Sequence, residues 1–270
     1  MAKRPLALRI AGLQYRFVRE MNDVHIFLNQ VLPLLKDAKE DYEHSTHRKD
    51  RRYYVPAVDR VKFAKRTDQE LKNIYHRFMN GSLYEAFLVM AVSRFESLIA
   101  EVLKLVFVEY PQKLGIAVHG VAPCKTVPTE LLLRADSIED ALQKAIDGHL
   151  NSVMYGAPHA YLAYVGEVVG VDTTAPEFER YIEIKATRDL LVHSTGIVNL
   201  IYLAKAGSKR RGQVGDPIGV DRKYFDRALA TLKRLSGIIK RDTANSFPVS
   251  RRPTPMDADA KGTRGSSPSR

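Results

Sequence analysis

Cysteine is almost absent from this chain, and so are long apolar runs. The single cysteine, Cys124, excludes an intrachain disulfide and is typical of a protein from a reducing cytoplasm. Crossing a bilayer takes roughly 18–20 consecutive apolar residues, and even the apolar stretch 98–108 is interrupted by Glu101 and Lys104. The basic N-terminus is not followed by a convincing signal-peptide cleavage site. We therefore expect a cytoplasmic protein that does not enter the membrane.

Several chemical signatures are missing as well. The chain has no dinucleotide-binding fingerprint, and its glycine-rich segment 207–217 lacks the Gly-Lys-Ser/Thr ending of a phosphate loop. The eight histidines are scattered, without the tight ligand spacing of a zinc site. Cys124 lies between two prolines with no histidine nearby in sequence, which favours a passive thiol over a nucleophile. These absences predict no metal and no cofactor.

The composition is that of a folded protein with basic ends. Of the 270 residues, 45% are hydrophobic and 27% are charged, which makes disorder of the whole chain improbable. The net charge of +11 divides into +7 for residues 1–80, +1 for residues 81–245 and +3 for residues 246–270. Attraction to a polyanion would therefore come from the ends of the chain, and the alternative is a role in solubility alone.

Residues 1–80 are predicted to form a basic N-terminal helical arm and linker. Apolar residues recur every three or four positions from Ile10 to Leu35, which indicates a long amphipathic helix. Pro33 should kink this helix or end it nearby. We interpret residues 1–44 as an accessory arm outside the main domain.

The segment 44–66 is strongly basic, with eight Lys or Arg residues against two Asp. Basic side chains can follow a phosphate backbone, and tyrosines can stack on unpaired bases. Arg51, Arg52 and Tyr53 are therefore candidates for contact with RNA. A solvated linker is the alternative interpretation.

Residues 81–241 are predicted to form the main domain. Ser82 and Glu85 have the spacing of a capping box and precede an apolar helix that should run to Pro111. Further helix-start signals occur at 137–140, 174–177 and Asp221. Residues 242–270 are rich in Ser, Pro, Gly and Arg and are predicted to be a disordered basic tail. The expected fold is all-α, an antiparallel helical bundle with an N-terminal helical extension.

The segment 181–196 places a permanent cation and a titratable imidazole five residues apart, at Arg188 and His193. Arginine can hold a phosphate through two parallel N–H bonds, and histidine, with a reference pKa near ~6.5, can give or take a proton. Positions five apart on an ideal helix differ by about 140° around the axis. The two side chains therefore face one small ligand only if the helix loosens before Gly196 or if two chains share one cleft, and both options favour a dimer.

This arrangement resembles the HEPN family of all-α domains, many of which are endoribonucleases of toxin–antitoxin and phage-defence systems. The resemblance rests on Arg188, the polar Asp189 that follows it, His193 and the order of helices over roughly residues 81–241. It implies that Arg188 and His193 are the catalytic pair, that Asp189 supports them and that two chains face each other as a homodimer. It also implies RNA as substrate and an antitoxin or another regulatory protein as a partner.

Three further points stay open in the sequence. Arg19, followed by Glu20 and then His25, also fits the bare motif, but only the later motif ends a predicted helix before a glycine. Glu96 is either exposed to solvent or paired with Arg188. The consecutive cations of the glycine-rich loop either contact RNA or belong to a solvated turn: Lys209, Arg210 and Arg211.

Two functions follow from these observations. The first is a metal-independent endoribonuclease in which His193 moves a proton and Arg188 stabilises charge on the phosphate, while the 2′-hydroxyl of RNA attacks phosphorus. The second is a HEPN-like scaffold without catalysis, which binds RNA or a nucleotide, or dimerises, and in which Asp189 holds Arg188 in a structural ion pair.

Overall fold

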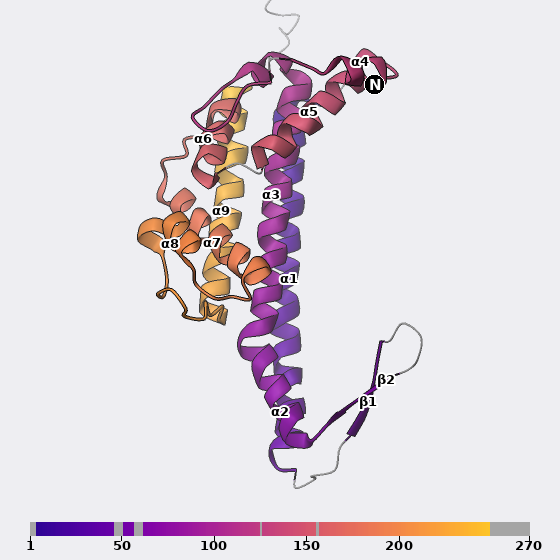
Figure 1. Cartoon of the computed structure of the whole chain (residues 1–270), viewed down its shortest axis with the longest axis vertical. Coiled ribbons are helices and arrows are strands. Elements are labelled where there is room, and N and C mark those ends of the chain that lie inside the picture. The colour runs from indigo at the N-terminus through magenta and orange to yellow at the C-terminus, as the bar shows by residue number, and fades with distance from the viewer. Residues whose placement is uncertain (1–3, 46–50, 57–61, 125, 155–156, 249–270) are drawn as a thin grey trace, which may run out of the picture.

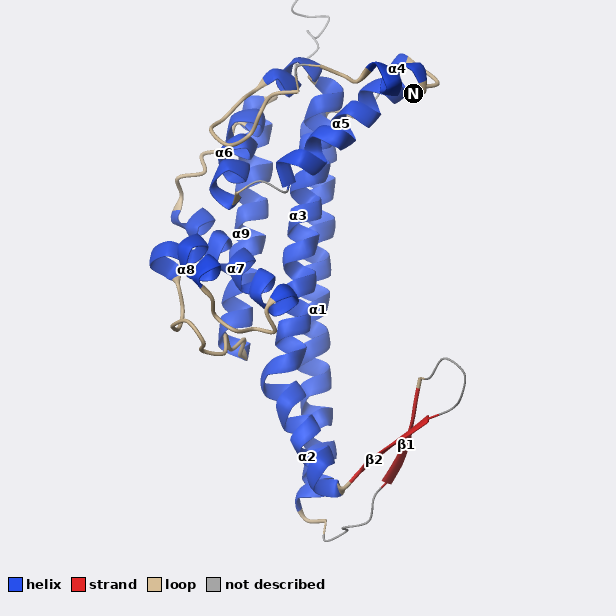
Figure 2. Ribbon diagram, viewed as in Figure 1, coloured by secondary structure: helices blue, strands red, loops and turns tan. Residues whose placement is uncertain are grey.

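The computed structural model describes residues 4–45, 51–56, 62–124, 126–154 and 157–248. Within these residues the fold is an all-α bundle with one two-stranded hairpin, which confirms the predicted fold class (Figure 2). The last helix continues past the predicted end of the domain at Arg241 and ends at Ser246. The predicted disordered tail from residue 249 onward lies outside the described residues.

Three long helices form the body of the molecule: α1 (Leu6–Glu43), α3 (Leu83–Glu109) and α9 (Arg222–Ser246) (Figure 1). The start of α1 meets the end of α3 through the Arg9–Glu109 ion pair, so these two helices are antiparallel. Arg222 at the start of α9 donates a hydrogen bond to Asn29 of α1, which makes this pair antiparallel as well.

Helix α1 is part of the main core, so its interpretation as an accessory arm was wrong. Its buried apolar residues pack in the same cluster as those of α3 and α9: Leu6, Ile10, Phe17, Met21, Val24 and Leu28. An apolar stripe of this length has to be buried against a partner, and α3 and α9 supply that partner surface.

Pro33 does not end α1, which was one of the two outcomes predicted for it, the other being a kink. The helix runs for 38 residues, or roughly 57 Å at a rise of 1.5 Å per residue. The proline is exposed, and the segment after it packs on helix α2 (Asp68–Arg77), where Tyr42 stacks on Tyr75 with ring centroids 5.8 Å apart. Packing on both sides of the proline therefore holds the helix together.

The basic segment after α1 forms an antiparallel hairpin, β1 (Arg51–Val55) and β2 (Lys62–Arg66), and is not a simple linker. A capping box then begins α2: the Glu70 amide donates to the Thr67 hydroxyl, and the Thr67 amide donates to the Glu70 carboxylate. The predicted capping box at Ser82 does not form. A π-helical turn (Phe78–Ser82) joins α2 directly to α3, so the chain has no break at the predicted domain boundary near residue 80.

The remaining helices pack around α3 and α9. They are α4 (Thr129–Leu133), α5 (Ile138–Met154), α6 (Pro158–Val169), α7 (Pro176–His193) and α8 (Leu200–Ala206), with short 3-10 turns at Pro111–Gly115 and Gly207–Lys209. Two predicted caps are present, because Ser137 accepts from the amide of Asp140 and Asp221 accepts from the amide of Tyr224. In the part of the chain that the structure describes, no helix is both long enough and apolar enough to span a bilayer.

Candidate functional site

Helix α7 carries both residues of the predicted catalytic pair. It begins at Pro176, as predicted, but Thr174 does not form a capping box: its hydroxyl donates to Asp172 at 2.7 Å, and Ala175 occupies the capping position. The helix ends at His193, where Thr195 and Gly196 adopt positive φ angles of 49° and 74°. Left-handed backbone favours glycine, which explains why a glycine follows the helix here.

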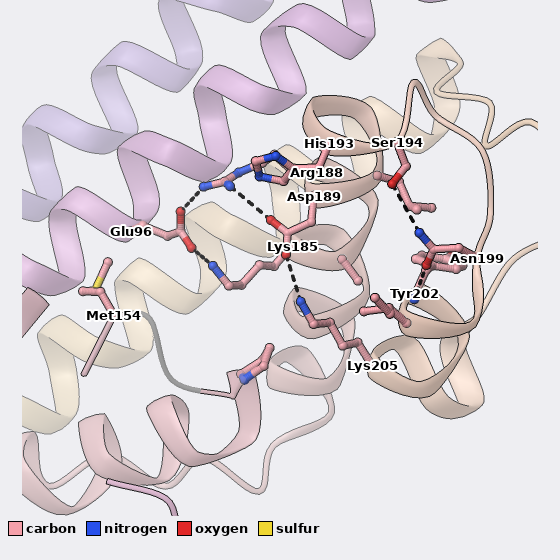
Figure 3. Close-up of a pocket in the computed structure, with 14 residues that line it drawn as sticks. Glu96, Met154, Lys185, Arg188, Asp189, His193, Ser194, Asn199, Tyr202 and Lys205 are labelled. Carbon is pink, nitrogen blue, oxygen red and sulfur yellow. Dashed lines mark hydrogen bonds and ion pairs between the residues drawn. The ribbon is translucent and has the colours of Figure 1, made fainter. Parts of the chain in front are cut away.

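Arg188 and His193 line one pocket of about 520 Å³ between α3, α7 and α8. Figure 3 shows the two side chains among the charged residues of this pocket, which we call the α7 pocket. The angular separation expected from an ideal helix does not keep them apart, because the long arginine side chain reaches into a wide cavity. A single chain therefore brings both groups to the same opening.

The α7 pocket contains an unbroken chain of alternating charges. Lys185 and Arg188 both donate to the Glu96 carboxylate. Arg188 Nη1 also donates to Asp189 Oδ1 at 3.0 Å, and Asp189 Oδ2 accepts from Lys205 Nζ at 3.3 Å. Three cations therefore surround two carboxylates, which gives the pocket a net positive charge before His193 is counted.

The sequence left open whether Glu96 is exposed to solvent or paired with Arg188, and in the structure it is paired. It is 7% exposed, and burial of a carboxylate is costly unless cations compensate it. Lys185 and Arg188 do so here, from the side of α7 that faces α3 (Figure 3). Glu96 thereby fixes the position of the Arg188 guanidinium.

Three residues that hold or charge the α7 pocket were not predicted from the sequence: Lys185, Asn199 and Lys205. Lys185 lies three positions before Arg188 and so shares its helix face, a signal that was present in the sequence. Asn199 caps α8 by accepting from the Tyr202 amide at 2.9 Å, and its amide group donates to Ser194. This contact ties α8 to the end of α7 and brings Lys205 to Asp189, which no sequence spacing indicates.

The glycine-rich loop does not present three free cations. Arg211 turns inward and donates from Nε to Glu183, from Nη1 to the Gly219 carbonyl and from Nη2 to Thr187. Its guanidinium also lies 3.7 Å from the centroid of the Tyr224 ring. Arg211 is therefore a structural residue, because each of its guanidinium nitrogens already donates one hydrogen bond. These bonds disfavour its predicted contact with RNA, which stays a prediction.

The other two loop cations stay near the surface. Lys209 lies 3.7 Å from Glu179, and Arg210 is exposed. Glu183, which receives Arg211, is 5% exposed and also accepts from the hydroxyls of Tyr202 and Tyr224 at 3.0 and 2.8 Å. Burial and the nearby Glu183 carboxylate raise the pKa of Tyr224, so its phenol stays protonated and donates.

The predicted RNA contacts of the N-terminal region lie away from the α7 pocket. Arg51, Arg52 and Tyr53 belong to the β1–β2 hairpin, which projects from the end of the bundle formed by α1 and α2 (Figure 1). The structure therefore does not join them to Arg188 and His193 in one site.

The rival motif at Arg19 and His25 does not converge. His25 lies 3.4 Å from Asp226 and lines a shallow pocket between α1 and α9, and Arg19 is not among the residues that line it. Glu20 is engaged instead with Arg94 at 2.8 Å. The later motif, which its sequence context already favoured, has both residues in the lining of one pocket, and the Arg19–His25 motif does not.

Among the described residues, no group of three or more His, Cys, Asp or Glu side chains has the geometry to hold a metal ion. The chain matches no protein-family model, no curated protein and no solved structure.

Proposed function

We propose that this protein is a metal-independent endoribonuclease, of the kind that acts as a toxin or a phage-defence effector. The observation that carries the proposal is that Arg188 and His193 line one pocket whose cations outnumber its carboxylates. A positively charged pocket attracts a phosphodiester, and the histidine at its edge supplies an acid–base group. The resemblance of the motif to HEPN domains supports the same reaction.

In this reaction His193 accepts the proton of the RNA 2′-hydroxyl. The 2′-oxygen then forms a bond to phosphorus while the bond from phosphorus to the 5′-oxygen breaks, and the leaving oxygen takes a proton from solvent. Arg188 stabilises the charge that builds on the phosphoryl oxygens, and Glu96 holds it in position. Proton transfer contributes roughly 10²–10⁴-fold to the rate, and a preorganised cation contributes roughly 10²–10³-fold.

Asp189 has a supporting role that depends on Lys205. The Asp189 side chain is 24% exposed, so a phosphate that enters the pocket can displace it from Arg188. Lys205 then keeps the displaced carboxylate compensated. When phosphate replaces Asp189 as the partner of Arg188, Asp189 therefore keeps Lys205 as its own partner, and no charge is left unpaired.

A homodimer and a regulatory protein partner such as an antitoxin belong to the proposal. Large apolar side chains are exposed beside the α7 pocket: Val192, Ile197, Leu200 and Ile201. Ile201 also lines the pocket itself. Exposed apolar side chains close together in sequence can form an interaction site, and a second copy that covers them would place its own motif near the first.

The alternative is a scaffold that binds RNA or a nucleotide without cleaving it. One observation favours it: Arg188 already holds two carboxylates on two helices, so its ion pairs also join α3 to α7. This alternative expects RNA binding without turnover that is unchanged in Arg188→Ala.

The test is cleavage of unstructured RNA by the purified protein in the presence of a metal chelator. We expect the wild-type chain to cleave and His193→Ala to lose at least roughly a hundredfold in rate. His25→Ala is the matched control, because it removes a histidine of the rival motif outside the α7 pocket. Equal cleavage by wild type and His193→Ala would contradict the mechanism.

A further inference from the structure

The β1–β2 hairpin has two faces with different surroundings. Residues directly opposite in an antiparallel pair share a face, and faces alternate along each strand. The register pairs Arg52 with Lys65 and Tyr54 with Phe63, so these four side chains lie on one face. Arg51 and Tyr53 lie on the other face.

The face with Arg51 is attached to the helices. Arg51 Nε lies 2.8 Å from Asp68 Oδ1 of α2, and the Arg51 guanidinium lies 5.5 Å from the ring centroid of Tyr42 on α1. The Asp68 side chain is 2% exposed, so this ion pair is rooted in the body of the protein. The attachment orients the hairpin and leaves its opposite face pointing outward.

The outward face, which we call the hairpin platform, consists of Arg52, Tyr54, Phe63 and Lys65. Tyr54 is 75% exposed and Phe63 48% exposed, with ring centroids 4.7 Å apart. Arg52 lies 5.8 Å from the Phe63 ring centroid, and both cations of the platform are exposed. The ten strand residues contain five Lys or Arg and no acid.

We propose that the hairpin platform binds single-stranded RNA. Unpaired bases offer π-faces that stack on exposed aromatic rings, and adjacent cations contact the phosphates. A duplex hides its base faces, and an apolar protein partner gains nothing from the two exposed cations of the platform, Arg52 and Lys65. The choice of RNA over DNA rests on the proposed function; the recognition chemistry rests on the hairpin alone.

The platform lies apart from the α7 pocket, at the end of the bundle beyond α2 (Figure 2). It therefore contributes affinity and not chemistry: it holds one part of an RNA chain while another part reaches the pocket. The sequence analysis grouped Arg51, Arg52 and Tyr53 as RNA contacts, but the register puts them on two faces. Arg51 and Tyr53 lie on the attached face. Arg52 lies on the platform with Tyr54, Phe63 and Lys65.

The test measures binding of a labelled oligouridine by fluorescence anisotropy, in a His193→Ala background so that cleavage does not intervene. The variant Tyr54→Ser/Lys65→Gln is expected to bind at least roughly tenfold more weakly, since loss of one stacked base and one phosphate contact each weaken affinity. The matched control Tyr15→Ser/Lys36→Gln changes the same residue types at exposed positions of α1 and should stay within about twofold.

A second variant, Tyr54→Ser/Phe63→Ser, keeps every charge. It should lose affinity for oligouridine while its affinity for heparin, a polyanion without bases, stays within about twofold. Wild-type oligouridine affinity in both platform variants would overturn the proposal, as would equal affinity for duplex RNA and oligouridine. Persistent cleavage by His193→Ala would overturn the α7 pocket mechanism. The platform comparison would then use 2′-O-methyl oligouridine, which has no free 2′-hydroxyl to attack phosphorus, so the two failures are distinguishable.

Discussion

Arg188 and Arg211 lie on opposite sides of helix α7 and have opposite settings. Arg188 shares its two carboxylates with lysines, because Glu96 also receives Lys185 and Asp189 also receives Lys205. Arg211 is the only cation paired with Glu183 among the described residues, and each of its three guanidinium nitrogens donates a hydrogen bond. Arg188 Nε is buried and has no hydrogen-bond partner in the same part of the chain.

Comparison of the two arginines shows how a binding site differs from a structural ion pair, which we call a clasp, when both contain arginine and glutamate. Arg188 with Glu96 belongs to the candidate site, and Arg211 with Glu183 forms the clasp. In the Arg211 clasp each guanidinium nitrogen donates a hydrogen bond, and the pocket beside it, of about 250 Å³, has about half the volume of the α7 pocket. The α7 pocket has surplus cations, an unused donor and a cavity of about 520 Å³ beside it. Removal of Arg188 should therefore lower activity, and removal of Arg211 should lower the free energy of unfolding.

The largest effect is expected from Arg188→Ala. We predict a loss of roughly 10²–10³-fold in RNA cleavage rate, because the cation that stabilises phosphoryl charge is gone. The free energy of unfolding should change by no more than about 1 kcal/mol, since each carboxylate retains a lysine. Parallel cleavage assays and urea titrations measure both quantities, and a large loss of stability with unchanged cleavage would make Arg188 the clasp.

Arg211→Ala should act mainly on stability. Removal of one partner of a buried ion pair costs roughly 3–5 kcal/mol, and we expect about 3 kcal/mol here because three hydroxyl donors remain on Glu183. The urea midpoint should fall accordingly, while the neighbouring exposed position provides the control, with Arg210→Ala within about 0.5 kcal/mol of wild type. Equal effects of the two substitutions would show that the burial of Arg211 contributes nothing.

A buried histidine, His149, extends the comparison, because it has no ion-pair partner among the residues that the structure describes. His149 is 9% exposed and lies 2.7 Å from the Tyr164 hydroxyl, and burial lowers its pKa. The unfolded chain therefore takes up the proton first as the pH falls. The stabilising contribution is complete above about pH 6.5 and is lost as the pH falls toward the lowered folded-state pKa.

Thermal unfolding measured from about pH 7.5 to about pH 5, which extends about one unit above and about 1.5 units below that reference pKa, tests this prediction. His149→Leu should show a weaker loss of stability over this interval than wild type, whereas Tyr164→Phe, which keeps the histidine, should follow the wild-type slope. Identical slopes in wild type and His149→Leu would assign the acid sensitivity to other groups.

Asp189→Asn should have the smallest effect. The substitution removes a partly exposed carboxylate and leaves Arg188 and Lys205 with more net positive charge. We expect RNA to bind a few-fold more tightly at low salt, with an unfolding free energy within about 1 kcal/mol of wild type. Weaker binding would mean that Asp189 positions Arg188 and does not merely neutralise it.

Much of the helical framework was predictable because it is encoded locally. The apolar stripes of α1, α3 and α9, the cap at Asp221 and the glycine after His193 each indicate their element within a few residues. The HEPN-like identity and the catalytic role of Arg188 and His193 stay predictions, although the structure places both residues on one pocket.

The missed features depend on contacts distant in sequence. Pro33 stays helical because α1 is packed on both sides of it, and the Ser82 signal is overridden because α2 continues into α3. The five strand cations gave no apolar alternation from which to predict strands, and the hairpin depends on cross-strand pairs such as Tyr54 with Phe63 and on the Arg51–Asp68 ion pair. The sequence Lys209-Arg210-Arg211 does not indicate which side chain points inward. That depends on the buried Glu183, which is distant in sequence and pairs with Arg211.

The central claim is that Arg188 and His193 act on a phosphodiester through the neighbouring 2′-hydroxyl. The most direct measurement is mass spectrometry of the products that the purified protein makes from one RNA oligonucleotide and from the same sequence with 2′-deoxyribose throughout, both with chelator present. The account predicts fragments with a 2′,3′-cyclic phosphate from the RNA and an intact deoxy oligonucleotide. Cleavage of the deoxy oligonucleotide, or RNA fragments without the cyclic phosphate from a chain that still requires His193, would contradict it.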